Sequence, residues 1–393
     1  MTPSVTGPVA RLSAYAAAVP PSGIREIAHL VAGRADVLHL EYGEPDFNAA
    51  PHVVAAAAAA AEAGARYTPT PGPMPLRSAL ADKLAAVQHV DYAPEQVVVT
   101  AGGAQALAAV FAVCVEPGDE VMLPDPGFPN FAMLAVLHGA RVVPYRLDPT
   151  AGFHPDPDEI RALLTPRTKL LVLNSPSNPT GAVIPAADLQ RIVESAAANG
   201  TVVLSDEVYD QLVFDGEPTA AASYAPEWVV GVYSFSKSHA MTGWRLGYLA
   251  AAGDVAAVIA RLQEPLISCT SALAQAGAMA ALTGPTDTLV EMRAAYRRRR
   301  DLVVSRLAAA GVEVAVPEGA FYCMFPLADG VDSRLAALDL IGEGVACAPG
   351  SAFGTVAKSH LRLSLAAADS VLADAVDRLT AWAARTDAGA AAG

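Results

Sequence analysis

A repeated alternation between short apolar runs and stretches of helical length does most to limit the fold of this chain. Runs rich in valine and leucine predict strands at Gln96–Thr100, Glu120–Leu123, Ala140–Tyr145, Lys169–Asn174, Thr201–Ser205, Val229–Ser234 and Leu246–Ala251. The stretches between several of them predict helices at Gln105–Val115, Asn130–His138, Asp158–Leu164 and Ala186–Ala198. This alternation is typical of a mainly parallel sheet with helices on both faces. We therefore expect an α/β fold.

The pattern changes beyond about residue 285. A long helix is predicted at Thr286–Ala310 and is followed by Gly311, a residue suited to a C-cap. Further predicted elements are strands at Glu313–Val316, Ala320–Pro326, Gly344–Ala348 and His360–Ser364 and a closing helix near Ser370–Thr386. We expect a large domain at 46–285 and a smaller α+β domain at 286–393. Residues 1–45 are too few to fold alone, and we expect them to pack on the smaller domain.

Composition excludes several classes of protein. The 393 residues are 53% hydrophobic and 17% charged, which excludes a disordered chain. A formal charge of −14 argues against nucleic acid or an anionic membrane as partner. The basic cluster Arg293 and Arg297–Arg300 lies in a predicted helix with acidic neighbours, so we expect a solvated helix face there.

The spacing of cysteine and histidine indicates whether the chain holds disulfides or a metal site, and hence in which cellular compartment it works. The four cysteines form no C-x-x-C pair and the eight histidines no H-E-x-x-H, so we expect reduced thiols and no metal site. The uncharged stretches 97–115 and 265–286 are interrupted by glycine and polar residues, which favours ordinary helices over membrane spans. The N-terminus lacks a sustained apolar core. We expect a cytoplasmic protein.

The strongest motif is SFSKSHAMTGWR, residues 234–245, directly after a predicted strand. A lone lysine is usually a solvated surface residue, but Lys237 lies among three large apolar residues, Phe235, Met241 and Trp244. Poor hydration favours the neutral amine that Schiff-base chemistry requires. Ser234, Ser236 and Arg245 supply hydroxyl and guanidinium donors suited to a phosphate.

Two further motifs follow predicted strands. In SDEVY, residues 205–209, Asp206 ends a strand, so its carboxylate points into the crevice where α/β sheets bind ligands. Asp206 could hold a ring nitrogen protonated and Tyr209 could donate to a phenolate oxygen; the alternative is a helix N-cap. In NSPSNPTG, residues 174–181, Asn178 would reach the same edge, and the alternative is a plain turn.

A strand-to-helix junction, TAGGAQAL, spans residues 100–107. The amides of Gly103, Ala104 and Gln105 at a helix N-terminus would form a phosphate cradle. Because the junction is neither G-x-G-x-x-G nor a Walker loop, it does not predict a nucleotide.

The order of these motifs along the chain resembles that of the class I/II aminotransferases, which are pyridoxal 5′-phosphate (PLP) enzymes of fold type I. The resemblance covers nearly the whole length. It rests on GEPDF (43–47), YTPTPG (67–72), LPDPGFPN (123–130), NSPSNPTG, SDEVY, SFSKSHAMTGWRLGY, GAFY (319–322), APGSAFG (348–354) and LRLS (361–364).

The resemblance implies a role for each matching residue. Lys237 would form a Schiff base with PLP and later carry the Cα proton. Asp206 would pair with the pyridinium nitrogen, Asn178 and Tyr209 would hold the phenolate oxygen, and Phe128 would stack on the ring.

The remaining implied contacts involve the phosphate and the substrate. Ser234, Ser236, Arg245 and the amides of Gly103 and Ala104 would bind the phosphate. Tyr67 would reach the phosphate in a partner subunit, which implies a homodimer with shared active sites. Arg362 would clamp the substrate α-carboxylate through two parallel hydrogen bonds, with the backbone of Gly43 and the amide of Asn178 nearby.

We thus expect an aminotransferase that moves an amino group from an L-amino acid to a 2-oxo acid by a ping-pong mechanism. One alternative is a PLP-dependent lyase or decarboxylase on the same fold, because these enzymes share the same residues around the ring. Another is a PLP-binding transcription regulator, which the acidic chain and the early GEPDF motif disfavour. Aromatic, aspartate-like and small aliphatic amino acids all remain open as substrates.

Overall fold

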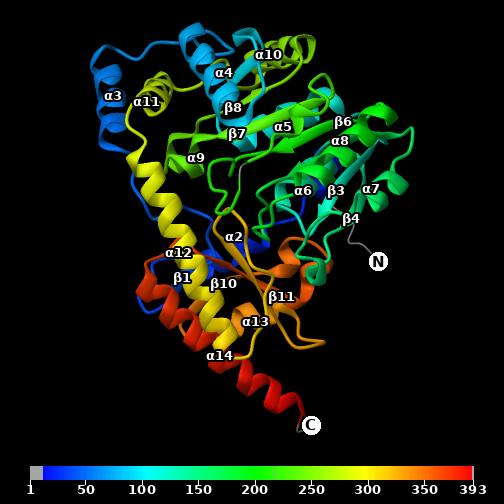
Figure 1. Ribbon diagram of the computed structural model, residues 1–393, viewed down its shortest axis with the longest axis vertical. Coiled ribbons are helices and arrows are strands. Elements are labelled where there is room, and N and C mark those ends of the chain that lie inside the picture. The colour runs from blue at the N-terminus through cyan, green and yellow to red at the C-terminus, as the bar shows by residue number, and fades with distance from the viewer. Residues whose placement is uncertain (1–11, 217, 392–393) are drawn as a thin grey trace.

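The computed structural model describes residues 12–216 and 218–391. Residues 1–11 of the expected N-terminal segment, residue 217 of the expected large domain and residues 392–393 of the expected small domain lie outside the described residues. The described chain forms a seven-stranded and a four-stranded sheet, which lie in the upper and lower halves of Figure 1.

The larger sheet has the strand order β2-β8-β7-β6-β5-β3-β4. Its strands are β2 (Val97–Thr100), β3 (Glu120–Asp125), β4 (Arg141–Arg146), β5 (Thr168–Asn174), β6 (Val202–Asp206), β7 (Val229–Ser234) and β8 (Gly247–Ala250). Neighbouring strands are parallel except at β8, which runs antiparallel to β2 and β7. The predicted, mainly parallel sheet is confirmed.

Alternate residues of the central strands face opposite sides of this sheet, as the two-residue period of a strand requires. Leu170 and Val172 of β5 pack with the helices α5, α6 and α10, whereas Leu171 and Leu173 pack with α4, α8 and α11. The helices of this half are α3 (Pro51–Glu62), α4 (Met74–Gln88), α5 (Gly103–Cys114), α6 (Pro129–Leu137), α7 (Pro157–Leu163), α8 (Ala186–Asn199), α9 (Phe235–Ser238), α10 (Gly253–Ile267) and α11 (Ala272–Thr283).

The smaller sheet joins the start of the chain to its end. Its strands, in the order β1-β10-β11-β9, are β1 (Leu38–Leu40), β10 (Val345–Pro349), β11 (His360–Ser364) and β9 (Tyr322–Pro326). β1 pairs with β10 in parallel, and the other pairs are antiparallel. The remaining α-helices are α1 (Ala14–Ala18), α2 (Gly23–Leu30), α12 (Asp287–Ala309), α13 (Ser333–Leu340) and α14 (Asp369–Ala391). Short 3₁₀ helices are η2 (Pro94–Gln96), η3 (Pro149–Ala151), η4 (Ala221–Ser223), η5 (Thr242–Trp244), η6 (Gly350–Ala352) and η7 (Val356–Ser359).

The strand predicted at Glu313–Val316 is wrong. This segment has no regular secondary structure, although Val312 and Val314 pack partly buried against the core of the smaller sheet. The alternation of valine with polar residues resembles a strand, but a strand also needs a backbone partner. Conversely, β1 was not predicted, because three residues are too few to show a period.

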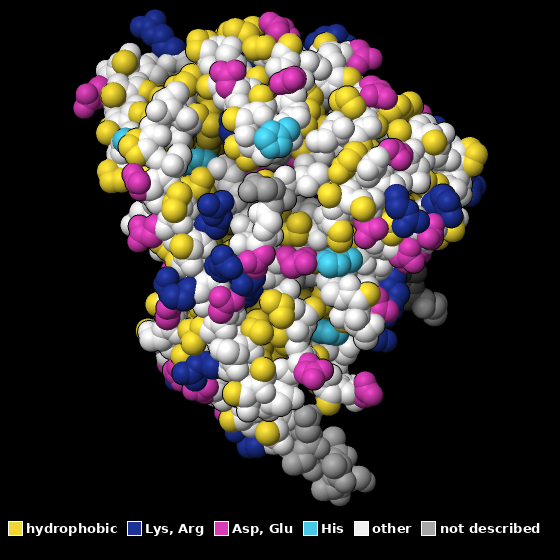
Figure 2. Space-filling view, in the orientation of Figure 1, with side chains coloured by type: hydrophobic (Ala, Val, Ile, Leu, Met, Phe, Trp, Pro, Cys, Tyr) yellow, Lys and Arg dark blue, Asp and Glu magenta, His cyan; other side chains and the backbone are white. Residues whose placement is uncertain are grey.

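The basic cluster on α12 is not the uniformly solvated face that its sequence predicted. Arg299 and Arg300 are only 6% and 7% exposed. Arg299 donates to both carboxylate oxygens of Asp46 at 2.8 Å, and Arg300 donates to Asp215 at 2.9 Å. These partners are distant in the sequence and allow the guanidinium groups to be buried. On the face shown in Figure 2, basic and acidic side chains lie interspersed.

Among the described residues, no helix is long and apolar enough to cross a membrane. The same part of the chain contains no group of three or more His, Cys, Asp or Glu side chains placed to hold a metal ion. All four cysteines are free thiols, and Cys323 and Cys347 are buried.

Candidate active site

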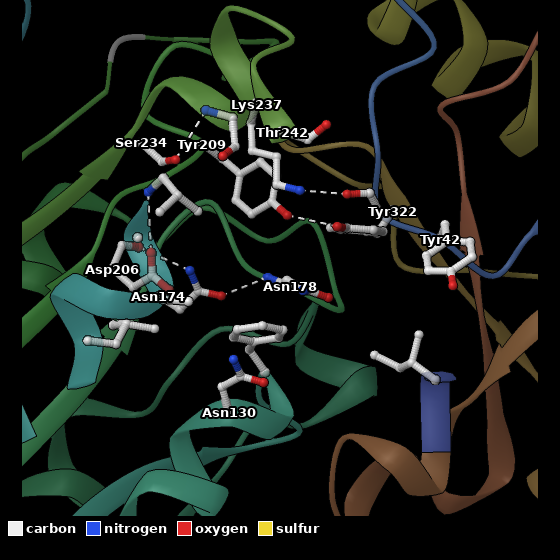
Figure 3. A pocket seen from close by; sticks show the side chains of 18 of the residues that line it. Tyr42, Asn130, Asn174, Asn178, Asp206, Tyr209, Ser234, Lys237, Thr242 and Tyr322 are labelled. Atoms are coloured by element: carbon white, nitrogen blue, oxygen red, sulfur yellow. Dashed lines mark hydrogen bonds between the residues drawn. The ribbon is translucent and has the colours of Figure 1, made fainter. Parts of the chain in front are cut away.

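A cavity of about 350 Å³ is lined by residues from both halves of the molecule (Figure 3). Asn174, Asp206 and Ser234 reach it from the carboxyl ends of β5, β6 and β7. Tyr322 of β9 and Arg362 of β11 reach it from the smaller sheet. The carboxyl ends of parallel strands are where α/β sheets bind ligands. This cavity is therefore the candidate active site.

Lys237 lies on α9, which begins directly after β7 and so places the amine at the edge of the sheet. Its Nζ donates a hydrogen bond of 2.5 Å to the carbonyl oxygen of Gly43 (Figure 3). Burial, together with the nearby guanidinium of Arg362, lowers the pKa of Lys237 to about 8. The neutral amine that nucleophilic attack requires is therefore more abundant at neutral pH than for an ordinary lysine.

Asp206, the last residue of β6, lines the same cavity and is 3% exposed. Burial raises the pKa of its carboxyl group to about 7, although the amide of Val208 and the charge of Lys237 both act to lower it. An additional cation or protonated heterocycle in the cavity would favour the ionised carboxylate. The site therefore combines a partly neutral amine with an acid that lacks a strong cationic partner.

The first turn of α5 is built to accept an anion. No described residue accepts a hydrogen bond from the amides of Gly103 and Ala104, and both residues line the cavity. Arg245 approaches Gly102 so closely that a Cβ there would lie 2.7 Å from its Nη2. Free amides at a helix N-terminus and an adjacent guanidinium together favour a phosphate.

Gln105 differs from the other residues predicted for this cradle. Its amide donates to the carbonyl of Gly102 at 3.2 Å, and its side chain binds the amide of Ala101 and the side chain of Gln263. Gln105 does not line the cavity. Within the described residues, the predicted phosphate cradle therefore consists of the backbone amides of Gly103 and Ala104.

Other predicted cofactor residues lie at the cavity, with one exception. The structure brings together Phe128, Asn178, Tyr209, Ser234 and Ser236. Tyr67, by contrast, is 93% exposed and does not line the cavity of its own chain. Its contact with the cofactor of a partner subunit stays a prediction.

Arg362 is 1% exposed and has one unsatisfied donor. Its Nη1 donates to Asn178 Oδ1 at 3.0 Å and its Nη2 to the carbonyl of Glu41 at 2.5 Å, whereas its Nε has no partner among the described residues. The guanidinium lies 4.4 Å from the ring centre of Tyr322. A buried donor without a partner is costly, so this geometry favours an anionic ligand at Arg362.

Gly43 lies in close contact with one of two tyrosines whose hydroxyl groups meet in the site, Tyr209 and Tyr322. The hydroxyl groups of Tyr209 and Tyr322 lie 2.7 Å apart, and a Cβ at Gly43 would lie 1.9 Å from the Tyr322 hydroxyl. Burial raises the pKa of Tyr209 well above its ordinary value, so its hydroxyl stays protonated and able to donate. Because glycine has no Cβ, the backbone at position 43 can lie against the Tyr322 hydroxyl and accept the hydrogen bond from Lys237.

Several residues of the cavity were not predicted from the sequence. Tyr322, Asn174 and Asn130 lie inside the GAFY, NSPSNPTG and LPDPGFPN motifs, whose strand-end positions were a usable signal. No such signal marked four residues that precede the first motif, namely Ser22, Ile24, Arg25 and Tyr42.

Comparisons with known proteins agree over most of the chain. A family model described as aminotransferase class I and II matches residues 35–379. The chain is 39% identical over 350 residues to the aspartate/prephenate aminotransferase of Thermus thermophilus, with 87% of this chain and 90% of that protein covered. It is 37% identical over 364 residues to the probable N-acetyl-LL-diaminopimelate aminotransferase of Bacillus subtilis, with 91% and 92% covered.

Solved structures show the same arrangement. The aspartate aminotransferase of Thermus thermophilus with maleate has a TM-score of 0.90 at 36% identity, covering 96% of this chain and 99% of that one. The alanine aminotransferase from Pyrococcus furiosus has a TM-score of 0.90 at 31% identity, covering 95% of this chain and 100% of that one.

Proposed function

Because the chain belongs to the class I and II aminotransferase family and transfers amino groups, we propose that the cavity around Lys237 binds PLP, the cofactor that this family implies. The relatives and solved structures named above are aminotransferases. They do not favour a PLP-dependent lyase or decarboxylase.

The residues of the cavity fit PLP group by group. The amine of Lys237, with a pKa of about 8, suits a covalent bond to the aldehyde carbon. The buried carboxyl group of Asp206, which lacks a strong cationic partner, suits a protonated ring nitrogen. The amides of Gly103 and Ala104 with Arg245 suit the phosphate.

When bound, PLP supplies an electron-poor ring that accepts the electron pair released at the substrate α-carbon. Asp206 then holds the proton at the ring nitrogen. The amine of Lys237, once the amino group of the substrate has displaced it from the aldehyde carbon, would move a proton between the substrate α-carbon and that cofactor carbon. Tyr209 and Asn178 donate to the oxygen on the ring, and Phe128 covers one face of the ring.

Substrate binding begins at Arg362, whose guanidinium takes the α-carboxylate that all amino acids carry. A further cation, Arg25, lies in the first turn of α2 and lines the same cavity. We propose that Arg25 binds a carboxylate on the substrate side chain. The chain would then accept a dicarboxylic amino acid, as the name of the Thermus thermophilus relative says of that protein.

We also propose that two copies pair to complete each other's sites. Tyr67 is 93% exposed, and Val54 and Leu266 on neighbouring segments are exposed by 50% and 51%. The loop of Tyr67 is tied to α10 by a hydrogen bond of 2.9 Å from Thr70 to Glu264. Large side chains exposed on these segments are what a second copy would cover.

The observation that carries the cofactor assignment is a single amine of lowered pKa beside the buried acid Asp206. We expect Lys237→Ala to lose multiple-turnover transamination between an L-amino acid and 2-oxoglutarate, and to release PLP on dialysis. Lys169→Ala, which removes an exposed lysine of β5, is the control and should behave like the unaltered protein. Sustained turnover by Lys237→Ala would overturn the assignment.

A further inference from the structure

A buried ion pair lies next to the active site without lining it. Lys83 of α4 donates to Asp210 Oδ2, and their side chains are 13% and 4% exposed. The Lys83 amine also donates to the hydroxyl of Tyr248 on β8 at 3.2 Å. Neither Lys83 nor Asp210 borders the cavity that holds Lys237. The proposed chemistry therefore gives this pair no direct role.

The surroundings of the pair hold it in one position. The Lys83 amine lies 5.5 Å from the ring centre of Tyr233 and 5.8 Å from that of Tyr248, and the two rings stack at 4.9 Å. Gln88 donates to Asp210 at 3.2 Å and accepts from the Tyr233 hydroxyl at 2.9 Å. Donors from α4 therefore converge on Asp210, supported by side chains of β7 and β8.

The turn that carries Asp210 brings three buried carboxyl groups together. Asp206, Glu207 and Asp210 are 3%, 4% and 4% exposed. Burial raises the pKa of Glu207 to about 7, and the charge of Asp210 adds to this rise. Burial alone would lower the pKa of Lys83, but Asp210 and the Tyr248 hydroxyl raise it above its ordinary value. Lys83 thus stays charged and offsets the repulsion within the turn.

The same short turn carries residues of the active site. Tyr209, whose hydroxyl meets Tyr322 in the cavity, directly precedes Asp210. The amide of Asp210 donates to the carbonyl of Glu207 at 3.0 Å, and the amide of Glu207 donates to Val232 of β7 at 2.9 Å. With so few rotatable bonds between them, a displacement of Asp210 would also move Tyr209 and Asp206.

We propose that Lys83 is a positioning residue for the cofactor. Its ion pair with Asp210 ties the turn 206–210 to α4, so that Asp206 and Tyr209 keep the positions from which they would contact the ring and its oxygen. This inference rests on the proposed function.

The test is Lys83→Met, which keeps the apolar stem of the side chain and removes its charge. It leaves Asp210 as a buried, unpaired carboxylate, which a protein relieves by moving the charge towards water. We expect the apoprotein to bind PLP about tenfold more weakly and kcat to fall about tenfold, which is the size of effect found between residues that contact one another. We also expect the absorption maximum of bound PLP to shift. KM for the amino donor should change less, because Arg362 is untouched.

Asp210→Asn combined with Lys83→Met provides the rescue. The neutral amide of Asn can still bind Gln88, so the double variant should bind PLP more tightly than Lys83→Met and recover the absorption maximum. If Lys83→Met does not fold, Asp210→Asn can be tested instead, because it breaks the same ion pair. The same shift of the absorption maximum is then expected.

The control is Leu379→Ala, which truncates a buried residue of α14 in the core of the smaller sheet. It should lower Tm but leave the PLP affinity and the absorption maximum unchanged.

The inference is wrong if Lys83→Met lowers Tm but binds PLP with unaltered affinity and an unaltered absorption maximum. The pair would then only stabilise the fold. If the unaltered protein itself binds no PLP, it is the proposed function that fails, so the two failures are distinguishable.

Discussion

At the scale of the residue, Arg25 is the side chain that we propose to separate one class of substrate from another. It lines the cavity together with Arg362, so an amino acid with two carboxylates can meet both cations. We expect Arg25→Gln to raise KM for aspartate about tenfold, the value of one hydrogen bond to a charged group, and to leave KM for alanine nearly unchanged. The measurement is steady-state transamination with each donor.

The control for this prediction is Arg34→Gln, which removes a half-buried arginine that pairs with Asp36 outside the cavity. It should alter neither KM. An equal rise for aspartate and alanine in Arg25→Gln would contradict a role for Arg25 in binding the side chain of the substrate.

A second residue-scale prediction concerns the pH at which Lys237 becomes reactive. Burial and Arg362 lower its pKa to about 8, whereas Glu44 and Asp206 act in the opposite direction. Because only the neutral amine attacks an aldehyde, the rate at which the apoprotein takes up PLP should rise with pH and level off above about 8. Stopped-flow absorbance from pH 6 to 10 measures this, with a free lysine derivative for comparison. A rate that climbs steadily to pH 10 would show that the pKa is not lowered.

Residues differ in how far the sequence alone could place them. Lys237 and Asp206 were predicted because each lies in a motif that follows a predicted strand. Arg362 was implied by the resemblance of the LRLS motif to the family. All three residues line the cavity. Arg25 and Lys83 were not, because their roles depend on contacts with partners that lie far away in the chain. The sequence around Lys83 contains nothing that separates a buried lysine from an exposed one.

At the scale of the element, apolar runs were a reliable guide where the sheet is buried on both faces. β7 has the bounds predicted for it, and β3 continues only two residues past Leu123, to Asp125. In the smaller sheet the same reasoning predicted a strand at 313–316 that is absent and missed β1. Pairing with β10 makes β1 a strand, and this depends on tertiary structure rather than on local pattern.

The start of α5 shows a similar limit. The two glycines located a helix N-terminus, but the amides that remain free there depend on how tightly the first turn is wound. Gln105 donates to the carbonyl of Gly102, three residues earlier, as in a 3₁₀ turn. A sequence motif therefore locates an anion site without specifying which amides form it.

At the scale of the whole molecule, the prediction concerns assembly. We expect a dimer in analytical ultracentrifugation at micromolar concentration. We expect Tyr67→Phe to stay dimeric but to bind PLP about tenfold more weakly, because it loses one hydrogen bond to a charged phosphate. Tyr15→Phe, which alters another exposed tyrosine, should bind PLP normally. A monomer with full activity would contradict shared sites.

Other whole-molecule expectations stay predictions, namely the domain limits 46–285 and 286–393 and the cytoplasmic location. Within the described residues, β1 pairs in parallel with β10 of the smaller sheet. The charge and composition of the chain indicate which kinds of partner it can bind, but they could not predict the pairing of β1 with β10.

The division of the cavity between distant parts of the chain also sets an order of events during synthesis. Every proposed cofactor contact made within one chain lies in residues 103–245, whereas the carboxylate clamp is at Arg362. A nascent chain whose central sheet has emerged from the ribosome would already contain all of these residues, although the contact from Tyr67 of a second copy would still be missing. It would have no clamp for its substrate until the last strand is translated. Translation therefore supplies the residues proposed to hold the prosthetic group before the residue proposed to hold the substrate.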